Sequence, residues 1–236
     1  MPNYEAIQDL KILSEAKNYN RWIYSMIYPF VGQRILDIGA GIGTFTEFFQ
    51  NRELVTILEV NDNCIEYLKE KFADKPNVKI IKHDLGKEKT NGFLKSQKFD
   101  TLLALSVLEH IEDDDLALEN FADIVDPLWG KIILQLPAFP KLYGSLDKHY
   151  DHFRRYTRQE VIDKMKRAGL RINYLIYFNS LGLFSWFVVG RLLRARGLNR
   201  GMIRFYDRIV TPVLSRLEWM WRPPFGQCFL VVAEKK

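Results

Sequence analysis

The stretch "ILDIGAGIGTF" (residues 35–45) decides how the chain folds. An apolar run that contains Asp37 leads directly into three glycines, Gly39, Gly41 and Gly43. Glycine permits a tight turn and lets backbone N–H groups approach a ligand closely. A plain connection between a strand and a helix needs only one glycine. Three glycines in five positions therefore favour a ligand-binding turn.

Short apolar runs like the first one recur downstream and alternate with helical patterns. We expect strands at 34–40, 54–60, 78–84, 99–106 and 130–138, and helices at 43–50, 62–72 and from about 113. Strands that alternate with helices indicate a parallel sheet covered by helices on both faces. Two further strands are expected at 171–178 and 226–235, and the 45 or so residues between them exceed an ordinary connection.

The positive charge of the chain is concentrated in that long connection. The net charge is +5 over 236 residues, yet residues 180–222 contain eight arginines, no lysine and only two acids. That segment alone carries +6, so the rest of the chain sums to about −1. The basic character is a local feature that needs a local explanation.

The two cysteines and the first residues bear on the compartment. Cys64 and Cys228 lie far apart, which fits neither a disulfide framework nor a zinc-binding spacing. Residues 1–20 are polar and lack the apolar centre of a signal peptide. We therefore expect a reduced, cytoplasmic setting.

Acidic residues close the first three expected strands. The turn reads G-x-G-x-G, with Thr44 where a dinucleotide fingerprint would have its third glycine. Glu59, 20 residues after Gly39, can accept hydrogen bonds from a ribose diol, and Asp84 can accept the amino group of an adenine. These positions predict a nucleoside-type ligand. A nicotinamide-dependent oxidoreductase is the less favoured alternative.

These features, with "HDL" (83–85) and "FDTLLALSVLEHI" (99–111), resemble the successive motifs of class I S-adenosylmethionine-dependent methyltransferases. The nearest likeness is to the bacterial type 11/12 subgroup, and it covers about residues 19–169 and the last strand. It implies a Rossmann-like α/β fold with a seven-stranded, mostly parallel sheet whose last strand is antiparallel. The implied cofactor is S-adenosylmethionine, and the implied product is S-adenosylhomocysteine.

The resemblance also implies a set of cofactor-binding residues. Asp37, Gly39 and Gly41 would surround the methionine part, and Glu59 would hold the ribose. The full set is Tyr19, Asp37, Gly39, Ala40, Gly41, Glu59, Val60, Asp84, Leu85, Leu105, Ser106 and His110. Tyr19 or Arg21 could cover the cofactor, or Tyr19 could simply pack its helix on the sheet.

The chain is interpreted as one methyltransferase domain, 1–236. A helical cover (1–33) precedes the cofactor-binding core (34–170), and a helical insertion (180–222) precedes the final strand (226–235).

The stretch "KHYDHFRRYT" (148–157) follows the fifth strand, where loops build substrate pockets in open α/β folds. We expect His149 and His152 to act in catalysis, because histidine suits proton removal near neutral pH. Tyr156 would position the acceptor, and Arg154 and Arg155 would bind an anionic group on it. The alternative is a structural turn in which an arginine pairs with an acid.

No metal site is expected. His149 and His152 could ligate zinc in principle, but no cysteine is near and methyl transfer needs no metal. In "LEHIEDDD" (108–115) the adjacent acids diverge and suit the start of a helix, whereas Glu109 and His110 would face the cleft.

The segment 180–222 has two interpretations. The first is a helical lid with solvated arginines. The second is an interfacial element at an anionic membrane surface, with apolar aromatics facing lipid and arginines facing phosphates. The expected acceptor is a small molecule or a lipid- or sugar-linked one, and the second interpretation places the chain at the inner face of the membrane. Nucleic acid is not expected, because the arginines are interleaved with a large apolar surface.

Overall fold

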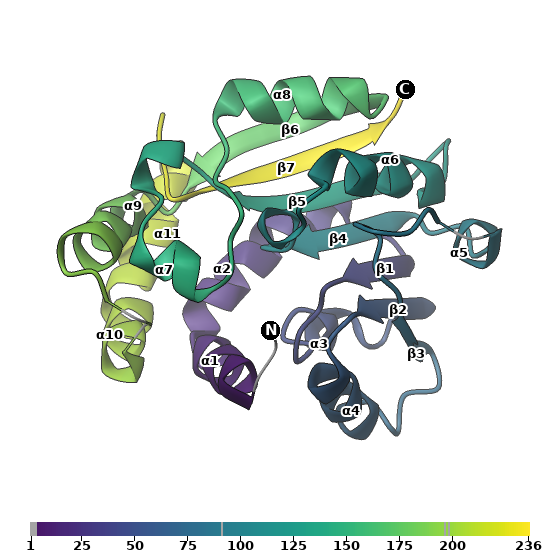
Figure 1. Ribbon diagram of the computed structural model, residues 1–236, viewed down its shortest axis with the longest axis horizontal. Coiled ribbons are helices and arrows are strands. Elements are labelled where there is room, and N and C mark those ends of the chain that lie inside the picture. Colours follow the sequence, from purple (N-terminus) through teal and green to yellow (C-terminus); the bar gives the residue numbers. More distant parts are fainter. Residues whose placement is uncertain (1–3, 91, 196, 198) are drawn as a thin grey trace.

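The computed structural model describes residues 4–90, 92–195, 197 and 199–236. Seven strands form one sheet in the order β3-β2-β1-β4-β5-β7-β6 (Figure 1). The strands are β1 Arg34–Ile38, β2 Leu54–Glu59, β3 Val78–Lys82, β4 Thr101–Leu105, β5 Lys131–Pro137, β6 Leu170–Phe178 and β7 Cys228–Lys235. Strand β7 pairs antiparallel with both β5 and β6, and the other pairings are parallel. The expected sheet is therefore confirmed.

Helices cover both faces of this sheet (Figure 1). They are α1 Tyr4–Ser14, α2 Lys17–Ile27, α3 Thr46–Phe49, α4 Asp62–Lys71, α5 Gly92–Ser96, α6 Asp114–Ile124, α7 Ser145–His149, α8 Arg158–Arg167, α9 Ser180–Trp186, α10 Arg200–Phe205 and α11 Thr211–Met220. Two π-helical segments, η4 Phe187–Leu192 and η5 Tyr206–Val210, extend α9 and join α10 to α11.

The core lies on both sides of the sheet because the central strands alternate their apolar side chains between its faces. In β5, Ile132 and Leu134 pack with α6 and α8, whereas Ile133 packs with α2. Strands buried on both faces read as continuous apolar runs, which explains why "KIILQLP" carries no polar alternation.

The insertion before β7 is ordered and helical, as its apolar content predicts. It is made of α9, η4, α10, η5 and α11, which gather at one end of the molecule (Figure 1). Pro212 does not break it, because it lies in the first turn of α11. In the described part of the chain, no helix combines the length and apolar character needed to cross a bilayer.

The helix after the glycine turn is much shorter than expected. We predicted helix over 43–50, but α3 begins only at Thr46. Gly43 has a φ of 71°, so the turn continues through it. Its added Cβ would also lie 2.8 Å from side-chain atoms of Leu68 and Phe72, so the close packing of α4 requires glycine here.

Candidate active site at the carboxyl edge of the sheet

Four strands of the sheet end in residues with left-handed backbone. They are Gly39 after β1, Ser106 after β4, Phe139 after β5 and Asn179 after β6, with φ between 56° and 62°. Residues other than glycine adopt this conformation at a cost, and such strain concentrates at functional sites. These four strands run in one direction, so the strained positions share one edge, which we call the carboxyl edge. Ligands of open α/β sheets bind there.

The glycine turn has room for backbone alone. A Cβ on Gly39 would lie 2.9 Å from both methyl carbons of Val107, and one on Gly41 would lie 3.1 Å from Leu10 of α1. Both glycines also have positive φ, 62° and 58°. The turn is therefore a backbone cradle whose shape a side chain would destroy.

Glu59 closes this cradle at the end of β2. Its Oε2 accepts the N–H of Gly41 (2.8 Å), and its Oε1 accepts those of Val60 (2.8 Å) and Asn61 (3.0 Å). A carboxylate can accept about four hydrogen bonds. A ribose hydroxyl can therefore bind Oε2 while the carboxylate keeps its present position.

Asp37 is buried at the end of β1, where the Thr46 hydroxyl donates to its Oδ2 (2.5 Å). Burial raises the pKa of Asp37 to about 7; the Thr46 hydrogen bond lowers it, and the nearby Glu59 charge raises it. A nearby cation stabilises the ionised form of a buried carboxyl group whose pKa is raised in this way. The cradle therefore fits a nucleoside cofactor with a cationic end.

The remaining cofactor positions lie along the same edge. Asp84 follows β3 and accepts the Gly86 N–H at Oδ1 (2.9 Å), and Leu85 beside it is buried. Leu105 ends β4, and the Ser106 hydroxyl accepts a hydrogen bond from Gln135 (3.0 Å). Contact of these residues with a cofactor stays a prediction.

Tyr19 shows the packing that we gave as its alternative. Its ring stacks on Phe178 at 6.4 Å and meets Trp22 edge-on at 6.0 Å. The tyrosine therefore secures α2 against β6. Cofactor coverage by Tyr19 stays a prediction.

On the acceptor side, Asp147 orients His152. Oδ1 of Asp147 lies 2.9 Å from Nδ1 of His152 and 2.7 Å from Nε of Arg155. Its Oδ2 accepts the Gly144 N–H (2.9 Å) and the Trp186 indole N–H (3.2 Å). Burial raises the pKa of Asp147, but the His152 hydrogen bond and the Arg155 charge outweigh that effect, so the pKa lies below its usual value.

His152 also belongs to a cluster with Glu109 and His110. One potential ligand atom from each residue lies within 4.8 Å of the others, and the two imidazoles meet edge-on at 4.7 Å. Glu109 is 1% exposed, and its Oε2 has no hydrogen-bond partner among the described residues. Burial raises the pKa of Glu109 to about 7 against the opposing charge of His152.

His110 contributes a neutral imidazole to this cluster. The side chain is partly open to solvent, but many protein atoms surround it. The resulting loss of hydration, together with the charge of His152, lowers the pKa of His110 to about 4. Two imidazoles and a carboxylate are also a donor set for a divalent transition metal. The spacing in the sequence pointed only to His149 with His152, and the expectation of no metal stays a prediction.

The structure separates the two histidines proposed for catalysis. His149 Nε2 lies 3.1 Å from Oδ2 of Asp9 in α1, whereas His152 alone joins the cluster. Asp147 is the residue that sequence reasoning missed. Its signal was weak, an aspartate five positions before His152, and its importance comes from α7, a helix that we did not expect.

Tyr156 does not line the edge and cannot position an acceptor. It is 1% exposed, and its hydroxyl donates to Oδ2 of Asp114 in α6 (2.9 Å). This corrects the expected role of Tyr156. The side chain belongs to the core beneath α6 and α8.

Arg154 and Arg155 both have structural partners. The burial of Arg155 corrects the expectation that it binds an anionic group of the acceptor, and for the partly exposed Arg154 that role stays a prediction. Arg154 Nη1 pairs with Asp114 (2.6 Å), and Arg155 pairs with Asp147 and donates to the Ala138 carbonyl (3.0 Å). The alternative of an arginine paired with an acid is the one observed. The acidic run at 113–115 behaves as expected for the start of a helix, because Asp113 accepts the Leu116 N–H at the start of α6 (2.9 Å).

Comparison with known proteins identifies the domain. A family model described as "Methyltransferase domain" matches residues 35–128. Residues 35–128 are a methyltransferase domain. The seven-stranded sheet around it is the Rossmann-like fold of S-adenosylmethionine-dependent methyltransferases, a family whose cofactor is S-adenosylmethionine. The chemistry of the cradle fits that cofactor, which carries a ribose for Glu59 and cationic groups for Asp37.

Solved structures share the fold of this methyltransferase at low sequence identity. An S-adenosylmethionine-dependent methyltransferase from Archaeoglobus fulgidus has a TM-score of 0.62 at 17% identity, covering 99% of this chain and 100% of its own. One from Mesorhizobium loti has a TM-score of 0.61 at 15% identity, covering 88% and 93%. The [4+2]-cyclase SpnF has a TM-score of 0.60 at 15% identity, covering 92% and 80%, so this fold also serves another reaction. No curated protein matches the chain.

Proposed function

We propose that this methyltransferase methylates a hydroxyl group of a small-molecule, lipid-linked or sugar-linked acceptor, with His152 as the general base. The observation that carries this proposal is the 2.9 Å contact between Nδ1 of His152 and the buried carboxylate of Asp147. An ionised carboxylate at Nδ1 holds the proton there and leaves Nε2 free to accept another.

The chemistry assigned to His152 follows from the needs of a hydroxyl. Bound S-adenosylmethionine would supply a methyl group on a sulfonium, with S-adenosylhomocysteine as the leaving group. A hydroxyl oxygen attacks this carbon well only as it loses its proton, and that proton passes to Nε2 of His152. The Asp147 carboxylate stabilises the imidazolium that forms, and alignment of the two reacting groups supplies much of the remaining rate.

Glu109 supports the same assignment. A buried carboxyl group without a hydrogen-bond partner is costly, so its Oε2 is expected to serve a ligand or a neighbouring charge. Because it lies in one cluster with His152, ionised Glu109 also stabilises the imidazolium. An acceptor hydroxyl that enters this cluster would meet groups able to accept its proton.

The test needs an acceptor, which methyl-labelled S-adenosylmethionine can reveal in cell extract separated into lipid and aqueous fractions. With that acceptor, His152→Ala is expected to lower turnover about 100-fold or more while leaving cofactor affinity, measured by calorimetry, unchanged. Added imidazole should restore part of the turnover. The matched control is His149→Ala, which removes a neighbouring histidine outside the cluster and should keep normal turnover.

Three outcomes would overturn the assignment. Full turnover in His152→Ala would show that no base is needed there, and parallel loss of cofactor affinity would show a structural role. Loss of wild-type turnover on chelation, with recovery on adding a divalent metal, would make the Glu109–His110–His152 cluster a metal site.

A further inference from the structure

The helical run 200–220 exposes a continuous row of apolar side chains. Helix α10, η5 and α11 follow one another without a break, and the row recurs every three or four residues along them. These side chains are between 48% and 74% exposed: Met202, Phe205, Ile209, Val213, Leu217 and Met220, together called the apolar row. A row of this length on a soluble surface marks an interaction site.

Buried polar contacts on the opposite side hold the apolar row outward. Oε2 of Glu218 accepts the Asn179 N–H (2.8 Å), and Oε1 accepts the Ser180 N–H (2.8 Å). Oδ1 of Asp207 accepts the Tyr19 N–H (2.9 Å). Rotating the helix to bury the apolar row would leave these two carboxylates without partners, which costs more than it gains. The exposure is therefore built into the fold.

A second apolar row lies on the neighbouring helix. Leu181, Phe184, Val188 and Leu192 of α9 and η4 are exposed at spacings of three or four. This helix and the run 200–220 lie at the same end of the molecule (Figure 1). The apolar surface is thus shared by two helices of one insertion.

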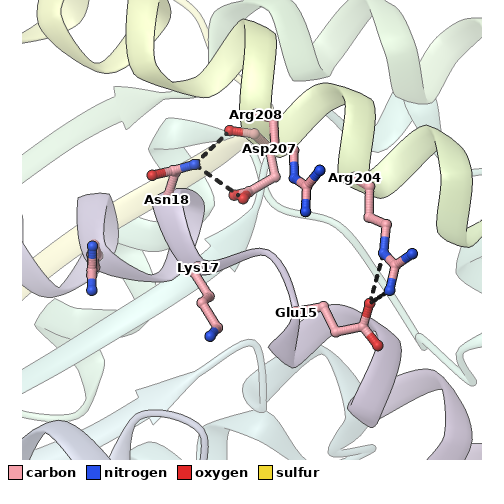
Figure 2. Close-up of a pocket in the computed structure, with 7 residues that line it drawn as sticks. Glu15, Lys17, Asn18, Arg204, Asp207 and Arg208 are labelled. Atoms are coloured by element: carbon pink, nitrogen blue, oxygen red, sulfur yellow. Dashed lines mark hydrogen bonds and ion pairs between the residues drawn. The ribbon is translucent and has the colours of Figure 1, made fainter.

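A cationic pocket lies beside the apolar row, between α2 and the run 200–220 (Figure 2). Its volume is about 430 Å³, and it is lined by Glu15, Lys17, Asn18, Arg21, Arg204, Asp207 and Arg208. Glu15 is paired with Arg200 and Arg204.

Asp207, the other acid of the pocket, accepts hydrogen bonds from the Asn18 side chain (3.2 Å) and the Tyr19 N–H. Within the described residues, Lys17, Arg21 and Arg208 make no ion pair with an acid. The pocket therefore has three cations to offer an anion, and guanidinium groups match phosphate oxygens in geometry.

The cations and the apolar side chains lie next to each other, and this arrangement indicates which kind of partner binds here. Arg204 and Arg208 precede Phe205 and Ile209 by one residue, so a positive row flanks the apolar row along the helix. An anionic bilayer offers phosphates at the same level as its apolar interior, which matches both rows at once. A second copy of the chain fits less well, because joining two apolar rows would bring like charges together.

We propose that the run 200–220, with α9 and η4, docks on an anionic membrane surface and that a lipid phosphate binds between Lys17, Arg21 and Arg208. The apolar row lies among the acyl chains near the headgroups, and the cationic pocket neutralises one headgroup. This docking is independent of the acceptor and of the base, so it can fail or succeed without regard to the proposed reaction.

The experiment is sedimentation of the full chain with vesicles of phosphatidylcholine alone or mixed equally with phosphatidylglycerol, without S-adenosylmethionine. We expect binding to the anionic vesicles at least about tenfold tighter than to the neutral ones, weakening as salt is added. Failure to sediment with anionic vesicles at low salt overturns the proposal.

Two variants separate the charges from the apolar row. Lys17→Glu with Arg208→Glu should weaken binding more than about 25-fold, since each cation near such a surface contributes about fivefold. Phe205→Ser with Ile209→Ser should weaken it about tenfold or more. Because all four side chains are exposed, both variants should keep the wild-type melting temperature and cofactor affinity.

The matched controls are Lys69→Glu on α4 and Trp129→Ser before β5, both exposed and outside the insertion. These should bind vesicles like wild type, and equal losses in controls and variants would overturn the proposal. Two further outcomes would do the same. One is that the wild-type chain is a dimer in light scattering and that the double variant Phe205→Ser with Ile209→Ser is a monomer. The other is tight binding of inorganic phosphate with no binding to vesicles.

Discussion

The carboxyl edge of this methyltransferase has two halves that are built in different ways. In the cofactor half, the functional groups lie at strand ends, and Glu59 is held by the backbone N–H groups of Gly41, Val60 and Asn61. In the acceptor half, the key carboxylate of Asp147 is held by the N-cap of its own helix, Gly144, and by two side chains, those of Arg155 and of Trp186 in the insertion. The first half depends on backbone geometry and the second on buried side-chain partners.

This difference predicts how each half fails. A substitution in the acceptor half removes a partner from a buried charge, so it should cost stability and disturb His152 together. A substitution in the cofactor half should weaken cofactor binding in addition to any cost in stability, because the turn and its acids form the expected cofactor cradle.

Arg155→Met should be the most damaging change. The Arg155 and Asp147 side chains are 1% and 0% exposed, so the substitution leaves a buried carboxylate without its guanidinium. Removing one partner of a buried ion pair costs about 3–5 kcal/mol of unfolding free energy, measurable by urea denaturation. The control is Arg154→Met, where Lys164 still pairs with Asp114 (2.7 Å) and about 1 kcal/mol is expected. Equal losses would contradict the contrast.

Gly39→Ala should damage the cofactor half in a different manner. Its φ of 62° and the 2.9 Å approach to Val107 together should lower the free energy of unfolding by about 2–3 kcal/mol. Cofactor affinity should fall at least about tenfold in calorimetry, since a displaced turn loses its backbone contacts. Gly169→Ala is the control, because Gly169 has a φ of 72° but no atom within 4 Å of the added Cβ. It should lose only about 1 kcal/mol and no affinity.

Asp37 should make cofactor binding depend on pH. Because its pKa in the free protein is about 7, the carboxyl group is protonated below that value and must ionise to hold a cation. Affinity should therefore fall as the pH drops below 7, by up to about tenfold per pH unit, in calorimetry. Asp37→Asn should remove this dependence, and an unchanged profile would refute it.

Asp37 should also make the free energy of unfolding of the cofactor-free protein depend on pH. The pKa of Asp37 is raised on folding, from 3.8 to about 7, so the folded state binds more protons than the unfolded state between these values. The contribution of Asp37 to the free energy of unfolding should therefore decrease as pH rises through that window. Asp37→Asn should consequently stabilise the free protein at pH 8, which thermal unfolding would show.

Tyr156→Phe should have the smallest effect. It removes one hydroxyl that donates to Asp114, whose carboxylate keeps Arg154 and Lys164, so about 1 kcal/mol of unfolding free energy is expected. Turnover should be unchanged because the ring lies in the core. A loss of turnover without a loss of stability would restore a catalytic role to Tyr156. Tyr177→Phe, which alters a half-buried ring on β6, is the control.

The cofactor half could be read from the sequence because its geometry is local. Asp37, Gly39 and Glu59 each lie at the end of a recognisable apolar run, and parallel strands bring such ends to one edge whatever the rest of the chain does. The number of strands, seven, and the antiparallel last strand came from the resemblance, and the structure confirms both.

The acceptor half could not be read in this way. "HFRRYT" shows two arginines and a tyrosine, but not that Asp114 and Asp147, 40 and 8 residues before their arginine partners, would neutralise both arginines. Nor does it show that Lys17 and Arg21 of α2 would meet Arg208 of the insertion across about 190 positions.

By itself, the sequence determined the strands, the glycine turn and the acids at its edge, because these depend on residue pattern and backbone geometry within a few positions. Folding set the rest: which histidine joins Glu109, which arginines pair with buried acids and which cations stay unpaired. Such outcomes depend on the pairing of charges from distant segments, and burial makes that pairing obligatory only once the chain has folded.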